Sequence, residues 1–204
     1  MTWAGAPGWM PEEFTLTGAD MARRGARTAE YIRVLRTLWD DEISEFSGEF
    51  YTVPRGSVQP KPVQPGGPPV ILGGMARPAL ERIGRLADGW VTSSRTDLSR
   101  IAEGIAVVKA AAERAGRDPG KLRFICRGVV RAGAPVSGQD SQRLLLSGSH
   151  QQIRDDAAWL GEQGVTELFY DLNWDPQIGS PLADPDAAAD RAAVLLEALA
   201  PAPA

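Results

Sequence analysis

The amino-acid sequence predicts an α/β fold built from repeated β-α units with parallel strands. The first indication is the apolar run 70–72, which lacks polar alternation and is therefore typical of a strand covered on both faces. The second is the glycine pair 73–74 that ends this run. The third is the amphipathic stretch that follows and leads into another apolar run at 89–92. Together they predict one unit of strand, turn, helix and strand.

The residues before this unit predict a weak strand and two helices. Residues 1–9 hold a glycine-interrupted strand, and Pro11 followed by two acids suits the first turn of a short helix. Over residues 28–39, apolar side chains recur every three or four positions, which predicts a helix with a buried stripe. We expect Arg33 and Arg36 to lie outside that stripe.

Residues 44–67 form a segment of different composition. Aromatic and β-branched residues separated by glycine and proline predict a small hairpin. Pro60, Pro62 and Pro65 then exclude a helix and favour an extended path. We therefore expect a hairpin and a proline-rich connector that lie across the surface as an insertion.

The rest of the chain alternates between helices and strands. Helices are predicted over 98–115, 149–163 and 186–199, and strands over 122–130 and 166–172. The strands near positions 70, 90, 126 and 169, with a doubtful one at the start, fit either a (β/α) barrel or an open doubly wound sheet. Since a complete barrel has eight strands in about 250 residues, these strands would supply only part of one.

Composition argues against several classes of function. The net charge is −4 and the basic residues are interspersed with acids, so we expect no nucleic-acid binding. No run approaches the roughly 18 apolar residues of a membrane span, and no secretory signal opens the chain. We therefore expect a cytoplasmic protein without membrane partners. One cysteine, Cys126, and one histidine, His150, argue against a disulfide framework and a zinc or iron cluster.

The glycine turn at residues 73–74 is the strongest candidate site. Two glycines allow a tight turn, so the first amides of the following helix, expected to begin near Met75, can point at a phosphate. Arg77 could reinforce such an anion, or it could be a solvent-exposed helix arginine. The alternative for the turn itself is that it requires glycine for steric reasons and binds nothing.

A series of short residue blocks runs through the chain. They are Arg24-Gly25, Glu30-Tyr31-Ile32, Leu38-Trp39, Gly48-Glu49-Phe50-Tyr51, Pro60-Lys61-Pro62-Val63-Gln64, Gly73-Gly74 and Ala87-Asp88-Gly89-Trp90. In this order they resemble the bacterial luciferase-like monooxygenase family. The resemblance implies one TIM-barrel domain over residues 1–204, with FMN or the deazaflavin coenzyme F420 bound at the carboxyl ends of the strands.

The resemblance also implies an activity and partners. We expect a flavin- or deazaflavin-dependent oxidoreductase or monooxygenase that acts on a small organic substrate. We also expect a homodimer and, with FMN, a separate flavin reductase that supplies reduced flavin. The implied phosphate site is the turn formed by Gly73, Gly74, Met75 and Ala76. Met75 and Ala76 stand where relatives often carry a polar residue and a serine, so a hydroxyl donor is absent.

A second departure from the family concerns length. The first three β-α units of the family have no counterpart, which predicts an incomplete barrel. Three interpretations are open. The chain could be an enzyme as it stands, or a catalytically inactive relative that serves as a binding or assembly subunit. Alternatively, Met1 is not the natural start and upstream coding sequence holds the remaining strands.

Further candidate residues lie at the strand ends. Trp9 could line the coenzyme pocket or belong to the core, and Trp90 is assigned to packing. Thr92, Ser93 and Ser94 follow a strand at the end where barrel enzymes carry their chemistry. They could bind coenzyme or substrate, or they could cap the next helix.

The later strands add weaker candidates. Alternation points Cys126 and Arg127 to opposite faces of one strand. Arg127 could meet an acidic ligand or pair with a neighbouring carboxylate, which is the commoner arrangement. His150 is expected to be a capping or surface residue, with acid-base work as the alternative. Tyr170 and Asp171 end the last strand in a position suited to a site.

Overall fold

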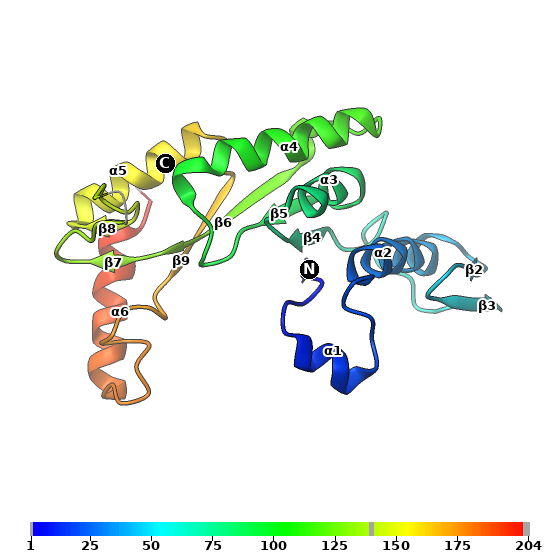
Figure 1. Cartoon of the computed structure of the whole chain (residues 1–204), viewed down its shortest axis with the longest axis horizontal. Helices are drawn as coiled ribbons and strands as arrows, with labels where there is room; N and C mark the ends of the chain where they lie inside the picture. Colours follow the sequence, from blue (N-terminus) through cyan, green and yellow to red (C-terminus); the bar gives the residue numbers. More distant parts are fainter. Residues whose placement is uncertain (1, 139–140, 202–204) are drawn as a thin grey trace. The chain divides into compact units, whose positions relative to one another are not determined.

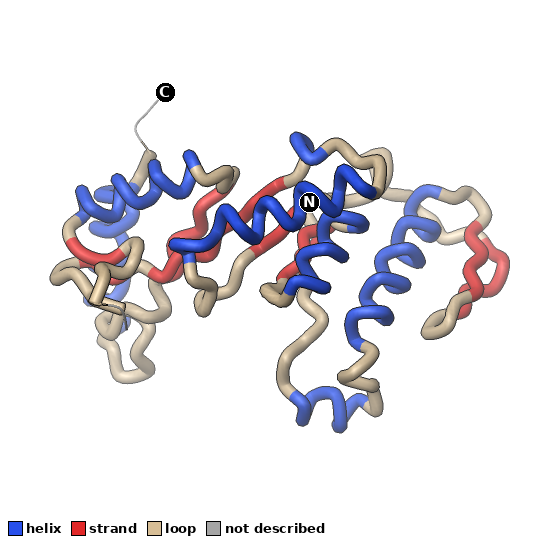
Figure 2. Tube along the Cα trace, turned by 45° about the horizontal axis from the view of Figure 1, so that its top comes forward, coloured by secondary structure: helices blue, strands red, loops and turns tan. Residues whose placement is uncertain are grey.

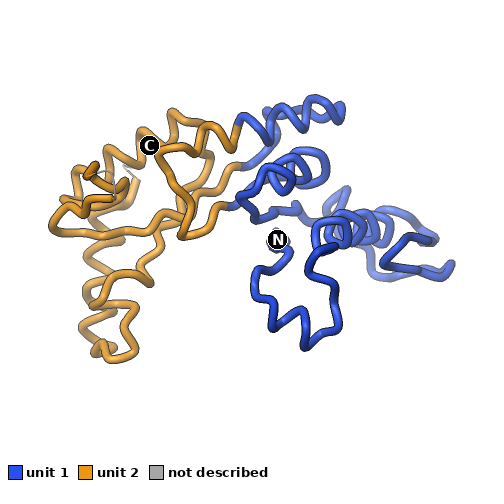
Figure 3. The backbone as a smooth tube through the Cα atoms, viewed as in Figure 1, with its two compact units in different colours: residues 1–91, 106–123 blue, residues 92–105, 124–204 orange. Residues whose placement is uncertain are grey.

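The computed structural model describes residues 2–138 and 141–201, which form two compact units (Figure 3). The first unit comprises residues 2–91 and 106–123, and the second comprises the described residues of 92–105 and 124–201. Met1, on which one interpretation of the chain start depends, lies outside the described residues. Figure 2 shows helices and strands alternating along the chain.

The first unit is built on three parallel strands. They are β1 (Trp3–Gly5), β4 (Val70–Gly73) and β5 (Gly89–Val91), and β4 pairs with both of the others. Figure 1 labels β4 and β5. All side chains of residues 70–72 are buried, as an apolar run without alternation predicts. Helix α3 (Arg77–Leu86) connects β4 to β5, so the predicted unit of strand, turn, helix and strand is confirmed.

Two helices separate β1 from the insertion. Helix α1 (Pro11–Thr17) begins with proline and two acids, as predicted. Helix α2 (Arg24–Asp40) begins four residues earlier than predicted and buries Ile32 and Val34. Arg33 is exposed and Arg36 is not among the buried residues of the helix, so both lie outside the buried stripe, as predicted. Arg36 is nevertheless half-buried, and its guanidinium lies 3.2 Å from the carboxylate of Asp88, a partner that the helical pattern did not indicate.

The hairpin predicted within residues 44–67 is confirmed. Strands β2 (Ser44–Ser47) and β3 (Thr52–Gly56) pair in antiparallel fashion. The carboxylate of Glu30 in α2 accepts hydrogen bonds from the backbone amides of residues 49, 50 and 51 at 2.8 to 3.0 Å. Burial opposes ionisation of Glu30, but these amides outweigh it and lower its pKa. One buried carboxylate thus anchors the hairpin turn to α2.

The second unit contains the later β-α elements. Strand β6 (Arg123–Val129) pairs in parallel with β9 (Glu167–Asp171). Between them lie a two-residue parallel pair, β7 (Arg131–Ala132) and β8 (Ser147–Gly148), and helix α5 (His150–Glu162). The pair β7 and β8 was not expected from the sequence.

The remaining helices complete the described fold. The 3₁₀ turn η1 (Leu98–Arg100) leads into α4 (Ile101–Arg114), which contributes residues to both units. A second 3₁₀ turn, η2 (Pro119–Lys121), precedes β6, and α6 (Pro185–Leu199) follows β9. Within the described residues, no helix is both long and apolar enough to cross a membrane.

Candidate functional site

The turn at residues 73–74 joins the carboxyl end of β4 to helix α3. Gly74 has a φ of 153°, which favours glycine, and a Cβ placed on it would lie 2.7 Å from the Cβ of Ala79. A Cβ on Gly73 would lie 3.3 Å from that of Ala6, in the segment that follows β1. The backbone conformation at position 74 and the close approach there both require a residue without a side chain.

Trp90 of β5 fixes the orientation of this turn. Its side chain is 3% exposed, and its indole Nε1 donates a hydrogen bond of 2.8 Å to the carbonyl oxygen of Gly74. Because a trans peptide unit is planar, the amide of Met75 points away from the oxygen that Trp90 holds. The prediction that Trp90 packs in the core is confirmed, and its hydrogen bond to the turn is an addition that the sequence pattern did not indicate.

Helix α3 begins directly after the turn, two residues later than predicted. Its N-cap residue, Ala76, has an extended backbone and supplies no side-chain hydrogen bond, and no acid lies in the first turn. Arg77 pairs with Glu81 at 3.1 Å and its side chain is 76% exposed, which confirms the solvent-exposed alternative for this arginine. An N-terminus without a side-chain cap or an acid suits an anion, since backbone amides and the helix dipole are directed at the same place.

Asp88 holds the start of the two strands beside the turn. Its carboxylate accepts a hydrogen bond from the amide of Val70 at 2.8 Å and pairs with Arg36 and Arg117 at 3.2 and 3.1 Å. A Cβ on Gly89, the next residue, would overlap the backbone carbonyl of Arg123. The block at residues 87–90 therefore has a structural explanation: it sets β4, β5 and the glycine turn in register.

The remaining predicted site residues of the first unit are exposed. Trp9 lies between β1 and α1 with 68% of its surface exposed, and Met75 is 51% exposed. Trp9 is therefore not a core residue. A role of Trp9 or of Met75 at a coenzyme stays a prediction.

Thr92 and Ser93 belong to the second unit. Thr92 is buried, and its Oγ1 accepts a hydrogen bond of 2.8 Å from the amide of Arg127. Ser93 is exposed and lies within hydrogen-bonding distance of the hydroxyl of Thr96. The cap of the next helical turn is Asp97, whose carboxylate accepts a backbone amide at 3.1 Å. The alternative that the hydroxyls of residues 92–94 cap it is therefore wrong. Ligand binding by Thr92 and Ser93 stays a prediction.

Arg127 and Asp171 form an ion pair between β6 and β9. The Nε of Arg127 donates to Oδ2 of Asp171 at 2.8 Å, and the aspartate is 1% exposed. Burial opposes ionisation of Asp171, but hydrogen bonds from Arg127 and Asn173 outweigh it, so the pKa of Asp171 is lowered. The neighbouring-carboxylate alternative for Arg127 is confirmed.

Cys126 and His150 lie in structural positions. Cys126 is fully buried, and burial raises the pKa of its thiol to about 11 against the opposing hydrogen bond with Thr92. A thiol with that pKa is protonated at neutral pH and is a poor nucleophile. His150 is the first residue of α5, and the cap is Ser149, whose hydroxyl accepts the amide of Gln152. The capping alternative for His150 is therefore wrong. Its side chain is half-buried at the start of the helix, and acid-base work by it stays a prediction.

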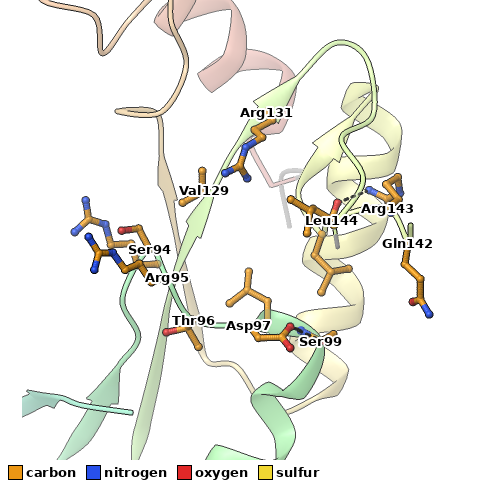
Figure 4. A pocket seen from close by; sticks show the side chains of 14 residues that line it. Ser94, Arg95, Thr96, Asp97, Ser99, Val129, Arg131, Gln142, Arg143 and Leu144 are labelled. Atoms are coloured by element: carbon orange, nitrogen blue, oxygen red, sulfur yellow. Dashed lines mark hydrogen bonds between the residues drawn. The ribbon is translucent and has the colours of Figure 1, made fainter. Parts of the chain in front are cut away.

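The second unit contains a pocket that we call the arginine pocket and that was not among the predicted sites (Figure 4). Its volume is about 470 Å³ and its walls come from residues 94–99, from β6 and β7, and from residues 142–145. Arg143 is anchored there by Asp156, with Nη1 and Oδ2 2.8 Å apart. These segments are far apart in sequence. The one local signal is that alternation along a strand places Arg127, Val129 and Arg131 on the same face.

Comparison with curated proteins gives relatives of greater length. The chain is 40% identical over 109 residues to an uncharacterized protein of Mycobacterium tuberculosis. The aligned segment covers 52% of the chain and 36% of that relative. The chain is 28% identical over 193 residues to a second uncharacterized protein of that species, covering 95% of the chain and 56% of the relative. It is also 30% identical over 92 residues to an FMNH(2)-dependent dimethylsulfone monooxygenase of Pseudomonas putida, covering 44% of the chain and 25% of the relative. The chain thus spans about half or less of the length of these relatives.

Solved structures and a family model agree with these relatives. An F420-dependent secondary alcohol dehydrogenase superposes with a TM-score of 0.70 at 17% identity, covering 83% of the chain and 63% of that protein. A coenzyme F420 dependent tetrahydromethanopterin reductase from Methanopyrus kandleri gives 0.70 at 13%, covering 96% and 72%. These likenesses confirm the predicted α/β fold with TIM-barrel-type β-α units. The model of the luciferase-like monooxygenases matches residues 4–135, so the chain belongs to the luciferase-like monooxygenase family.

Proposed function

We propose that this chain binds the phosphate of FMN or of coenzyme F420 at residues 73–76 and serves in an oxidoreductase that acts on a small organic substrate. The observation that carries the proposal is the hydrogen bond from Trp90 to the carbonyl of Gly74. It directs the amide of Met75 away from the carbonyl oxygen of Gly74, next to a helix N-terminus without a side-chain cap. Family membership supports it, as do relatives whose names include FMNH(2) and F420.

The residues of the turn fit a phosphate through their backbone. Glycine at positions 73 and 74 allows a close approach, and no carboxylate in the first turn of α3 repels an anion. Ala76 supplies no hydroxyl, however, and a hydrogen bond to a charged group typically contributes about 1.5–3 kcal/mol. We therefore expect a phosphate held by amides and the helix dipole, with weaker affinity than a turn that carries serine.

The proposed site gives the coenzyme the redox chemistry and gives the chain the binding and orientation of the coenzyme. When bound, FMN would supply monooxygenation with dioxygen, and F420 would supply hydride transfer. The chain would bind and orient the phosphate end, with Trp90 and Asp88 keeping the turn rigid. Cys126, with its raised thiol pKa, would remain protonated and take no part.

Two partner predictions accompany the proposal. We propose a homodimer and, if FMN is the coenzyme, a separate reductase that supplies reduced flavin. Mass measurement in solution tests the dimer, and turnover with and without an added flavin reductase tests the second partner. The rival proposal, a binding or assembly subunit without catalysis, predicts a folded chain that has no affinity for either coenzyme.

The experiment compares two glycine substitutions. Gly74→Val adds a side chain at a φ of 153° beside Ala79, whereas Gly161→Val adds one in α5 where no atom lies within 4 Å of the new Cβ. Titration followed by flavin absorbance and fluorescence should give a dissociation constant at least about tenfold higher for Gly74→Val than for wild type. Gly161→Val should bind as wild type does. Unchanged coenzyme affinity in a folded Gly74→Val variant would exclude the turn as the phosphate site.

A further inference from the structure

We propose that the arginine pocket of the second unit binds an organic carboxylate with a short apolar body. The pocket is formed entirely by residues of the second unit, whereas the glycine turn belongs to the first. The proposal therefore does not depend on coenzyme binding at the turn.

In the described part of the chain, the pocket holds an arginine without a paired carboxylate and a second arginine with unused donors. Among the described residues, Arg131 has no carboxylate within ion-pair distance, whereas Arg143 is paired with Asp156. Arg127 uses its Nε for Asp171, and within the described part of the chain no acceptor meets its two terminal nitrogens. A carboxylate has two oxygens that match the parallel donors of a guanidinium, which makes arginine well suited to it.

The carboxylate that lines the pocket already accepts hydrogen bonds from a neighbouring residue. Among the described lining residues, Asp97 carries the one carboxylate. Its Oδ1 accepts hydrogen bonds from the amide and the hydroxyl of Ser99 at 3.1 and 2.7 Å, where it caps η1. Asp97 therefore does not neutralise Arg131 directly, and the lining keeps an excess of positive charge.

The apolar walls decide the class of anion. Leu98, Val129 and Leu144 line the same space, and Thr96 adds a hydroxyl. Figure 4 shows the side chain of Arg131 directed toward Val129, with Leu144 on the opposite wall. Burying apolar surface against such side chains contributes about 25 cal/mol per Å², which inorganic phosphate cannot use. A volume of about 470 Å³ has room for a small aromatic or aliphatic acid.

Isothermal titration of the full chain with benzoate, benzamide and inorganic phosphate tests the proposal. Benzoate and benzamide have the same shape but differ in charge, and phosphate has charge without an apolar body. We expect benzoate to bind at least about tenfold more tightly than either of the others. Arg131→Gln should weaken benzoate binding about tenfold or more, and Arg114→Gln, at the exposed end of α4, should leave it unchanged.

A second variant covers the case in which Arg131→Gln does not fold. Leu144→Glu places a carboxylate on a wall residue that is 37% exposed, and it should abolish benzoate binding while circular dichroism stays that of wild type. Equal affinity for benzoate and benzamide, or for benzoate and phosphate, would overturn the proposal. Absence of benzoate binding at millimolar concentration, or unchanged binding by a folded Arg131→Gln or Leu144→Glu variant, would do the same.

Discussion

Trp90→Phe is expected to remove the hydrogen bond that holds the glycine turn while keeping an aromatic ring at position 90. The indole donates at 2.8 Å to the carbonyl of Gly74, and its side chain is 3% exposed. An unsatisfied buried acceptor costs about 1–3 kcal/mol, and Gly74 is half-buried, so we expect the lower half of that range. The smaller ring also buries less apolar surface, which adds about 1 kcal/mol. Together these give a loss of about 2–3 kcal/mol in the free energy of unfolding.

Urea denaturation followed by circular dichroism measures this loss. Trp174→Phe is the matched control, because Trp174 is 54% exposed and should change the free energy of unfolding by less than about 0.5 kcal/mol. If the turn binds phosphate, the dissociation constant for FMN or F420 should also rise several-fold in Trp90→Phe. A variant with both the stability and the coenzyme affinity of wild type would refute the role given to the indole hydrogen bond.

Three other substitutions test the scaffold. Glu30→Gln leaves an amide where a carboxylate accepts three backbone amides, so the melting temperature should fall by several degrees, and an unchanged value would contradict its anchoring role. Asp88→Ala removes the partner of two arginines and of a strand amide, and urea denaturation should show a loss of about 1.5–3 kcal/mol. The pKa of Asp171 is depressed below the ordinary 3.8, so its stabilisation is complete above that pH and is lost as the pH falls through the lower folded value. An acid titration of stability should therefore be flatter in Asp171→Asn, and superimposable curves would argue against this contribution.

The strand, turn, helix and strand unit could be predicted from sequence because its signals are local. An apolar run, a glycine pair and an amphipathic stretch follow one another within residues 70–91, and each acts on its own neighbours. The hairpin at 44–56 was predictable for the same reason. The pair β7 and β8 was not, since two residues are too few to show a period.

The features that could not be predicted are contacts between side chains of elements far apart in the sequence. Arg36 looked like a solvent-facing residue of an amphipathic helix because its partner Asp88 lies 52 positions away in the sequence. The hydrogen bond from Trp90 to Gly74 and the arginine pocket likewise depend on how elements pack, which periodicity does not record. Arg127 was the exception, since a half-buried arginine on a strand requires a carboxylate and Asp171 ends the adjacent strand.

Phosphate recognition at the glycine turn is tested most directly by comparing FMN with riboflavin, which lacks the phosphate, and F420 with its phosphate-free deazaflavin. Equilibrium titration of the folded chain should show one phosphorylated coenzyme binding at least about tenfold more tightly than its phosphate-free counterpart, with that preference lost in Gly74→Val. Equal affinity within both pairs would contradict phosphate binding at the turn. A folded chain that binds neither coenzyme would contradict the proposed oxidoreductase function as well.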